Sequence, residues 1–388
     1  MINIERVAEL LNEFNLDGWL LYDFRGSNPI LRRFLSLDQH THTTRRFVLW
    51  IPRNSTPLLI VSSIEPHLFE HVSIPKAFYH SRHQWHESIA TILKGVRRIA
   101  VEYSPLGQLP TVSYLDAGTA EFFRSFGVEL VSSADLIQSA EAVWTADQIA
   151  DNMQTARKLR EIMMATIKHA HTLAEREAST EFDLQQFILA AFEQHNLVCD
   201  HPPIVAIGEH SANPHYEPHP DHSAPLRLQT VLLLDMWAKS SKPEATYADI
   251  TWTLWLGNNP PDDIRTVAQT VFAARDNALQ LVRNRFASNA TVYGYEVDDA
   301  SRSVIAAAGY GDHFIHRTGH SIGTDVHGLG ANMDNYETID TRRILAGTSF
   351  SIEPGIYIPG YFGIRSECDV VIEPSGNVLV PSEPLQTD

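Results

Sequence analysis

Acidic side chains inside apolar, strand-like segments constrain the fold of this 388-residue chain more than any other feature. Asp235 closes the apolar run 231–234 and is followed by the bulky Met236 and Trp237, and Asp249 interrupts a similar run. An unpaired buried charge is very unfavourable, so the fold has to give each aspartate a partner. One such residue alone would indicate a cap or a salt bridge. Two on neighbouring predicted strands favour a shared site.

The bulk composition sets the frame for that site. The length exceeds one usual core, so two domains are expected. The first residues read as an acidic amphipathic helix rather than a signal peptide, and no run of 18 apolar residues occurs, so we expect a cytoplasmic protein that spans no membrane. A net charge of -17 argues against nucleic acid and anionic lipid as partners. Two cysteines, Cys199 and Cys368, are too few for a disulfide framework or a thiolate metal site.

The first 137 residues alternate between helix and strand patterns, which predicts a mixed α/β domain. The expected elements are a helix over 4–15, strands over 18–24, 46–52, 57–63 and 97–103, and a helix near 86–95. No glycine-rich phosphate loop follows any of these strands, so a nucleotide site is unsupported. The histidine-containing stretch 81–87 is expected to be a solvated loop.

Residues 138–388 combine long helix patterns with separate strand runs, which predicts a second domain of α+β type. The expected helices cover 146–176, 180–195, 260–285 and 294–308, and the expected strands cover 230–237, 248–256, 348–358 and 363–372. Thr180 is placed to cap the second helix.

Three histidines, His316, His320 and His327, fall within twelve residues of this second region. Gly319 and Gly323 allow the backbone to turn tightly around His320. A single histidine in an apolar strand is usually a satisfied core residue, but three in a glycine-punctuated stretch favour a site.

Two glutamates complete the set of candidate residues. Glu353 lies in the stretch SIEPG, where Pro354 and Gly355 end a predicted strand and fix the position of the carboxylate. Glu367 follows Arg365 by two residues, so the two side chains share one face of a strand. That pair alone would indicate a surface ion pair.

Together these candidates supply four carboxylates and one imidazole, a hard, oxygen-rich set that suits Mn²⁺, Co²⁺, Fe²⁺ or Zn²⁺. Four carboxylates exceed the needs of one divalent ion. Two ions roughly 3.5–4 Å apart, bridged by two carboxylates, would neutralise the cluster and hold a nucleophilic hydroxide between them. The sequence therefore predicts a dinuclear metal-dependent hydrolase.

The order Asp, Asp, His, Glu, Glu resembles that of the pita-bread metallopeptidases, which include methionine aminopeptidase, aminopeptidase P and prolidase. The first region, with the phrase LDGWLLYD, resembles the creatinase/prolidase N-terminal domain. The resemblance implies an α+β protein with a pita-bread catalytic domain over 138–388, a smaller mixed α/β domain over 1–137, and assembly as a homodimer.

The resemblance also implies a role for each candidate residue. Asp235 would bind the first metal, Asp249 and Glu367 would bridge the two metals, and His320 and Glu353 would bind the second. Glu353 would also be the proton shuttle. The substrate-facing groups would be His215, near the scissile bond, His327, at the tetrahedral intermediate, and His316, Tyr357 and Arg365, around the substrate proline and the bridging carboxylate.

These counterparts favour the Xaa-Pro branch, with hydrolysis of the bond before proline in Xaa-Pro dipeptides or N-terminal Xaa-Pro peptides. Manganese is the expected metal, with cobalt, zinc or iron as alternatives. Three positions depart from the usual pattern, namely Trp237 in place of glycine, Trp252 in place of arginine and Cys368 in place of an acid. Trp237 and Trp252 are expected to reshape the pocket.

Those departures leave two alternatives open. The first is a metal-dependent hydrolase or lyase that acts on a small non-peptide substrate with the same fold. The second is a metal-free binding protein or a creatinase-like enzyme. Such relatives typically lack several ligand carboxylates, whereas all five ligand positions are present here.

Overall fold

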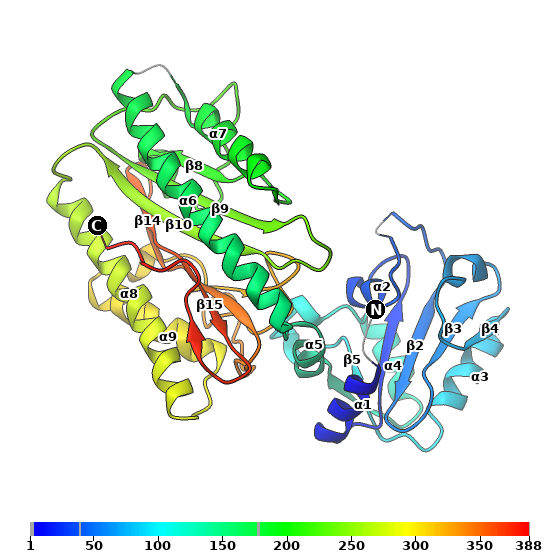
Figure 1. Ribbon diagram of the computed structural model, residues 1–388. Helices are drawn as coiled ribbons and strands as arrows, with labels where there is room; N and C mark the ends of the chain where they lie inside the picture. The colour runs from blue at the N-terminus through cyan, green and yellow to red at the C-terminus, as the bar shows by residue number, and fades with distance from the viewer. Residues whose placement is uncertain (1–3, 39, 177–178, 388) are drawn as a thin grey trace. The chain divides into compact units, whose positions relative to one another are not determined.

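The computed structural model describes residues 4–38, 40–176 and 179–387. The chain forms two compact units, Met1–Glu141 and Ala142–Asp388, shown in Figure 1. The domain boundary expected at residue 137 remains a proposal. Helix α5 (Ala134–Glu141) packs against α1 (Ile4–Glu13) within the first unit.

The first unit is built on one mixed six-stranded sheet with the order β4-β3-β2-β1-β5-β6. Its strands are β1 (Gly18–Asp23), β2 (Phe47–Pro52), β3 (Leu58–Ser62), β4 (Lys76–Tyr79), β5 (Arg98–Val101) and β6 (Glu129–Ser132). The β1–β2 and β2–β3 pairs are antiparallel, whereas β3–β4, β1–β5 and β5–β6 are parallel. The mixed α/β character expected for this region is confirmed.

Helices α2 (Pro29–Phe34), α3 (Arg82–Ile92) and α4 (Ala117–Arg124) complete this unit. The prediction of a solvated loop over 81–87 was wrong, because α3 begins at Arg82. Ser81 caps α3 by accepting a hydrogen bond from the Gln84 amide at 3.2 Å, and Trp85 is buried in the core beside Ile89. The stretch therefore begins a helix, and its tryptophan anchors that helix to the sheet.

In the second unit, the long helix α6 (Ala146–Arg176) covers one face of a strand pair, β9 (Thr230–Ser240) and β10 (Ala248–Leu256). Helix α7 (Glu181–Gln194) packs beside α6. Short strands β7 (Leu197–Val198) and β8 (Ile204–Ile207) add to β9. Thr180 caps α7 in a capping box with Asp183, as the sequence predicted.

The remaining elements form the other side of this unit. They are helices α8 (Asp262–Ala287) and α9 (Gly294–Ala307) and strands β11 (Ser321–Ile322), β12 (Ser349–Ile352), β13 (Gly355–Ile358), β14 (Phe362–Arg365), β15 (Cys368–Ile372) and β16 (Val378–Leu379). The strand expected over 348–358 is divided at Glu353 and Pro354 into β12 and β13, which lie in different sheets. Because of that break, Glu353 directly follows the last residue of β12 and belongs to neither strand.

Across the parts of the chain that the structure describes, every helix is too short or too polar to cross a bilayer.

Candidate active site

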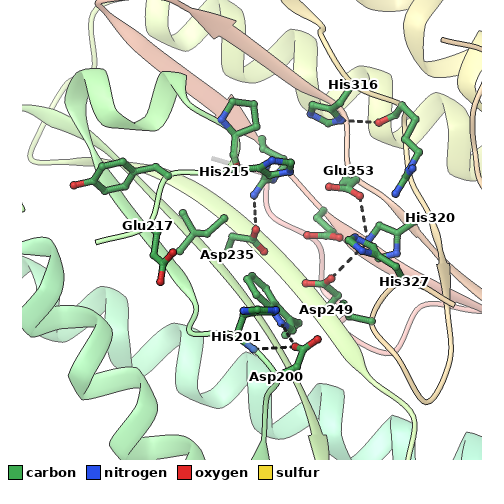
Figure 2. A pocket seen from close by; sticks show the side chains of 18 of the residues that line it. Asp200, His201, His215, Glu217, Asp235, Asp249, His316, His320, His327 and Glu353 are labelled. Carbon is green, nitrogen blue, oxygen red and sulfur yellow. Dashed lines mark hydrogen bonds and ion pairs between the residues drawn. The ribbon is translucent and has the colours of Figure 1, made fainter. Parts of the chain in front are cut away.

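A cavity of about 540 Å³ in the second unit collects all five residues that the sequence singled out as metal ligands. Figure 2 shows the carboxylates of Asp235, Asp249 and Glu353 and the ring of His320 gathered in the middle of this cavity. Glu367 lines it as well. Of the five residues that were expected to face the substrate or support it, His215, His316, His327 and Arg365 line the cavity, and Tyr357 lies behind His316.

The aspartates reach the cavity because side chains alternate along β9 and β10. Asp235 and Trp237 point into the cavity, whereas Met236 between them packs into the core under α6 and α7. Asp249 points the same way as Asp235, and Trp252 packs against the same core as Met236. The expectation that Trp252 reshapes the pocket was therefore wrong, because an odd spacing from Asp249 turns its side chain to the opposite face.

His320 is placed by a close approach of two backbones. A Cβ atom added at Gly319 would lie 2.0 Å from the Ser351 carbonyl oxygen, so only glycine fits there. The amide of Glu353 donates to the Thr318 carbonyl at 2.7 Å, which fixes the end of β12 beside the histidine segment. Gly319, which the sequence suggested as a turn residue, thus allows the backbone before His320 to approach strand β12 closely.

The hydrogen bonds of His320 define which ring nitrogen faces the cavity. Nδ1 lies 3.1 Å from the Ser321 carbonyl oxygen, which can only accept, so Nδ1 carries the proton. Burial, followed by the charge of Arg317, lowers the pKa of His320 to about 3, so the ring is neutral. Its bare Nε2 then lies 3.4 Å from Oε1 of Glu353 and 3.8 Å from Oδ2 of Asp249. Three lone-pair donors face one another, as ligands do around a cation.

Buried oxygens without partners point to the same conclusion. Asp249, His320 and Glu367 each offer a ligand atom within 4.8 Å of the others. Oδ1 of Asp249 and Oε1 of Glu367 are buried and have no hydrogen-bond partner among the described residues. Burial, and then the neighbouring carboxylates, raise the pKa values of both groups well above their usual range. Divalent cations would neutralise these groups, so the donor set fits a metal site.

A layer of polar side chains beneath the ligands was missed by the sequence interpretation. The Thr251 hydroxyl donates to Oε2 of Glu367 at 2.6 Å and accepts a bond from Nε of Arg365 at 3.2 Å. Oδ2 of Asp369 accepts from the backbone amide of Asp249 at 2.8 Å. Thr251 lies two residues from Asp249, and Asp369 lies two residues from Glu367. That spacing from the candidate ligands was the signal available in the sequence.

Ser351 belongs to the same layer. Its hydroxyl accepts from the His320 amide at 3.0 Å and donates to Oε1 of Glu353 at 3.1 Å. One buried hydroxyl therefore orients two candidate ligands, His320 and Glu353. Such supporting hydrogen bonds tune metal affinity as well as ligand geometry.

A directed hydrogen-bond chain runs along one wall of the cavity. Nδ1 of His316 lies 2.6 Å from the Arg317 carbonyl oxygen and must donate to it, so Nε2 accepts the Tyr357 hydroxyl proton at 2.9 Å. The Arg365 guanidinium donates to the Tyr357 hydroxyl oxygen at 3.2 Å and pairs closely with the Asp235 carboxylate. Burial lowers the pKa of His316 to about 4, so this ring is neutral and presents an apolar face.

The last two predicted residues, His215 and His327, flank the ligand cluster. The ring of His327 lies 4.4 Å from that of His320 and perpendicular to it. The neighbouring His320, and then burial, lower the pKa of His327 to about 4. His215 is exposed into the cavity on the segment between β8 and β9. Both rings line the cavity beside the carboxylates, and neither belongs to the group of Asp249, His320 and Glu367.

Comparison with known protein families places this site in context. The model of metallopeptidase family M24 matches residues 151–374, well over half of the chain. An Xaa-Pro dipeptidase of Lactobacillus delbrueckii subsp. lactis is 33% identical over 169 residues, which cover 43% of this chain and 41% of that protein. The probable dipeptidase PepE of Mycobacterium tuberculosis (strain ATCC 25618 / H37Rv) is 30% identical over 261 residues, 67% of this chain and 64% of that protein. The chain thus spans less than two thirds of both relatives.

Solved structures resemble the whole chain. The dipeptidase PepE from Mycobacterium ulcerans matches with a TM-score of 0.72 and 23% identity, covering 98% of this chain and 94% of that one. The prolidase from Pyrococcus horikoshii OT3 matches with a TM-score of 0.63 and 19% identity, covering 98% and 97%. At these identities the likeness concerns the fold.

Proposed function

Since the chain belongs to metallopeptidase family M24 and has the α+β pita-bread fold, we propose that it hydrolyses the peptide bond before proline, with two divalent metal ions. The substrates would be Xaa-Pro dipeptides or N-terminal Xaa-Pro peptides. The observation that carries the proposal is the bare Nε2 of His320, which faces the carboxylates of Asp249 and Glu353. Beside them, buried oxygens of Asp249 and Glu367 have no hydrogen-bond partner among the described residues. The prolidase and Xaa-Pro names of relatives support the choice of substrate.

Five residues would hold the metals. Asp249 and Glu367 would bridge the two ions, Asp235 would bind the first, and His320 and Glu353 the second. When bound, the ions would supply the Lewis acidity that polarises the scissile carbonyl and lowers the pKa of a water molecule. Manganese fits an oxygen-rich set with a single imidazole, although the same ligands accept cobalt, iron or zinc.

Glu353 is the proposed proton carrier. It is half-buried at the end of β12, and the Ser351 hydroxyl holds one of its oxygens. Water adds to the carbonyl carbon, Glu353 takes the proton that the water loses, and the C–N bond breaks as Glu353 passes this proton to the proline nitrogen. The products are a carboxyl group, which keeps the second proton of the water until it ionises, and a secondary amine.

Histidines would orient the substrate around that carboxylate. His215 would hydrogen-bond the peptide near the scissile bond, and a neutral His327 would donate an N–H to the oxyanion of the tetrahedral intermediate. The neutral ring of His316, fixed by Tyr357, offers an apolar surface on which the proline ring can pack. Arg365 would hold Asp235 and Tyr357 in place from behind.

One observation favours a second candidate, a hydrolase or lyase of a small non-peptide substrate. Trp237 fills part of the cavity wall, and its indole nitrogen donates to Oδ1 of Asp200 at 2.9 Å. A bulky side chain there narrows the space beside the ligands, which would favour a compact substrate. Assembly as a homodimer and a cytoplasmic location remain proposals that follow from the resemblance to the family.

The direct test is a substrate panel with enzyme that has been loaded with Mn²⁺. Xaa-Pro dipeptides, longer Xaa-Pro peptides and Xaa-Ala controls are compared by kcat/KM. We expect Xaa-Pro substrates to be preferred by about 100-fold or more, because a pocket built for one ring loses most of its contacts with alanine. No turnover of any Xaa-Pro substrate would reject the peptidase assignment, and turnover of small amides alone would support the second candidate.

A further inference from the structure

Glu181 is a fully buried carboxylate that lies outside the metal site, at the first residue of α7. A buried charge is tolerated only when hydrogen bonds replace the water it has lost. Here four donors do so. Oε1 accepts from the Ile207 amide at 2.8 Å and from Nδ1 of His210 at 2.9 Å, and Oε2 accepts from the Tyr216 hydroxyl and the Ala224 amide, both at 2.7 Å.

These donors share one stretch of chain. They come from the end of β8, from the 3₁₀ helix η4 (Gly208–Ala212), and from the middle and the end of the irregular segment that leads to β9. A single carboxylate therefore ties both ends and the centre of residues 207–224, which we name the His215 loop. Residues 213–224 contain no helix or strand, and such segments are usually the more mobile parts of a fold. The hydrogen bonds to Glu181 therefore supply order that a helix or strand would otherwise give.

The His215 loop brings substrate-facing residues to the cavity. His215 and Tyr216 both line the cavity, and the Tyr216 ring stacks on that of His210 at 4.4 Å. The Pro214 carbonyl oxygen accepts a hydrogen bond from Arg365 at 3.3 Å. Glu181 accepts the hydrogen bond of the Tyr216 hydroxyl, and Tyr216 directly follows His215 in the chain. Loss of this hydrogen bond would therefore allow the backbone at His215 to move.

We propose that Glu181 is a positioning residue for catalysis, which holds His215 at the scissile bond through the His215 loop. The inference rests on the proposed function for its catalytic consequence. Displacement of a catalytic group by about 1 Å can lower a rate 100-fold. If Glu181 only stabilised the fold, its replacement would lower stability without an effect that depends on His215. This difference makes the two roles separable.

The test is a double-mutant cycle between Glu181→Gln and His215→Ala. Glutamine keeps the acceptor for Ile207 and His210 but turns an NH₂ group toward the Tyr216 and Ala224 donors. We expect Glu181→Gln to lower kcat/KM for an Xaa-Pro peptide about 10- to 100-fold in the wild-type background and by less than about threefold in the His215→Ala background. Equal losses in both backgrounds would overturn the proposal.

Two further variants sharpen the cycle. Tyr216→Phe removes only the hydroxyl and is expected to reproduce much of the kinetic loss, which matters should Glu181→Gln fold poorly. Glu193→Gln, on the exposed side of the same helix, is the matched control and should leave kcat/KM unchanged. Mn²⁺ affinity should stay within about threefold of wild type in all three variants, because none of these side chains is a ligand.

Amide exchange tests the same proposal without a substrate. In Glu181→Gln, the amides of residues 207–224 should exchange at least about tenfold faster, while those of β9 and β10 stay protected. Unchanged exchange in the His215 loop would overturn the proposal. A wild-type protein without Xaa-Pro turnover would instead overturn the proposed function, and the exchange result would then decide the positioning role alone.

Discussion

Two histidines of the cavity, His316 and His320, each have one ring nitrogen without a proton, and the partners of these nitrogens differ. His316 and His320 each donate Nδ1–H to a backbone carbonyl, which leaves Nε2 bare on both rings. One bare nitrogen accepts the Tyr357 hydroxyl and the other faces carboxylates. His316 and His320 thus hold the same tautomer in different settings. His316 forms part of the pocket wall, whereas His320 is a proposed metal ligand.

Glu353→Gln separates proton transfer from binding. The amide keeps the size of the side chain but cannot accept and release a proton, so kcat should fall by about 10²- to 10⁴-fold. KM for an Xaa-Pro dipeptide should change far less. Steady-state kinetics on metal-loaded enzyme, with the bound metal measured in the same sample, would check this. A variant that keeps most of its activity would contradict the role of Glu353.

Trp237 on β9 and Trp252 on β10 offer a matched pair of substitutions. Trp237→Phe removes the indole bond to Asp200 at the cavity wall and should change KM for Xaa-Pro substrates severalfold. Trp252→Phe alters the core under α6 and should lower the free energy of unfolding by about 1–2 kcal/mol with kinetics within about twofold of wild type. The opposite pattern would show that these faces are wrongly assigned.

At the scale of elements, strand alternation decides which residues meet. On β10, Asp249 and Thr251 face the cluster, and on β12 and β15 Ser351 and Asp369 lie on that face as well. The meeting of Asp235 and Asp249 in one cavity could be predicted, because acids that interrupt apolar strands need partners. Their role as metal ligands stays a prediction. The supporting residues lie two positions from ligands and could have been found by the same period. Glu181 could not, since its partners lie 26 to 43 residues further along the chain.

Neighbouring serines on β12 test the supporting layer. Ser351→Ala removes the hydroxyl that orients His320 and Glu353, and should weaken Mn²⁺ binding about 10- to 100-fold. Ser349→Ala is the matched control, because the Ser349 hydroxyl is buried on the same strand without a partner among the described residues. Calorimetric titration of both variants measures the difference. Equal affinities would mean that Ser351 does not tune the site.

At the scale of the whole molecule, the sequence predicted the class of each half correctly but not every element. The helices and strands that alternate before residue 137 form a unit with one mixed sheet. The strand order of this sheet depends on pairings such as β1 with β5, which lie about 80 residues apart in the chain. Local patterns do not encode such partners. The proposed ligands all belong to the second unit, so metal binding should stabilise that unit.

A buried acid in the first unit predicts a pH dependence of stability. Burial raises the pKa of Glu102 to about 7, against opposing hydrogen bonds from Trp19, Asn28 and Ser133. Because the folded pKa lies above the unfolded value, this contribution to stability is complete below pH ~4.5 and is lost as pH rises through ~7. The expected loss is on the order of 3 kcal/mol.

The variant Glu102→Gln isolates this contribution. Urea unfolding is measured at pH 5 and pH 8 and monitored by pulse-labelled amide exchange in β1. Between pH 5 and pH 8, the free energy of unfolding should fall less for the variant than for the wild type. Other titrating groups cancel in that comparison. Parallel pH dependences of the two proteins would contradict a shifted Glu102.

The metal content of the protein tests the central claim most directly. The chain is equilibrated with Mn²⁺ or Co²⁺, separated from free metal, and analysed for bound metal per chain, with His320→Ala as the control. The five-residue site predicts two ions per chain for the wild type and fewer for the control. Fewer than one bound ion per wild-type chain, even after metal addition, would contradict a dinuclear metallohydrolase.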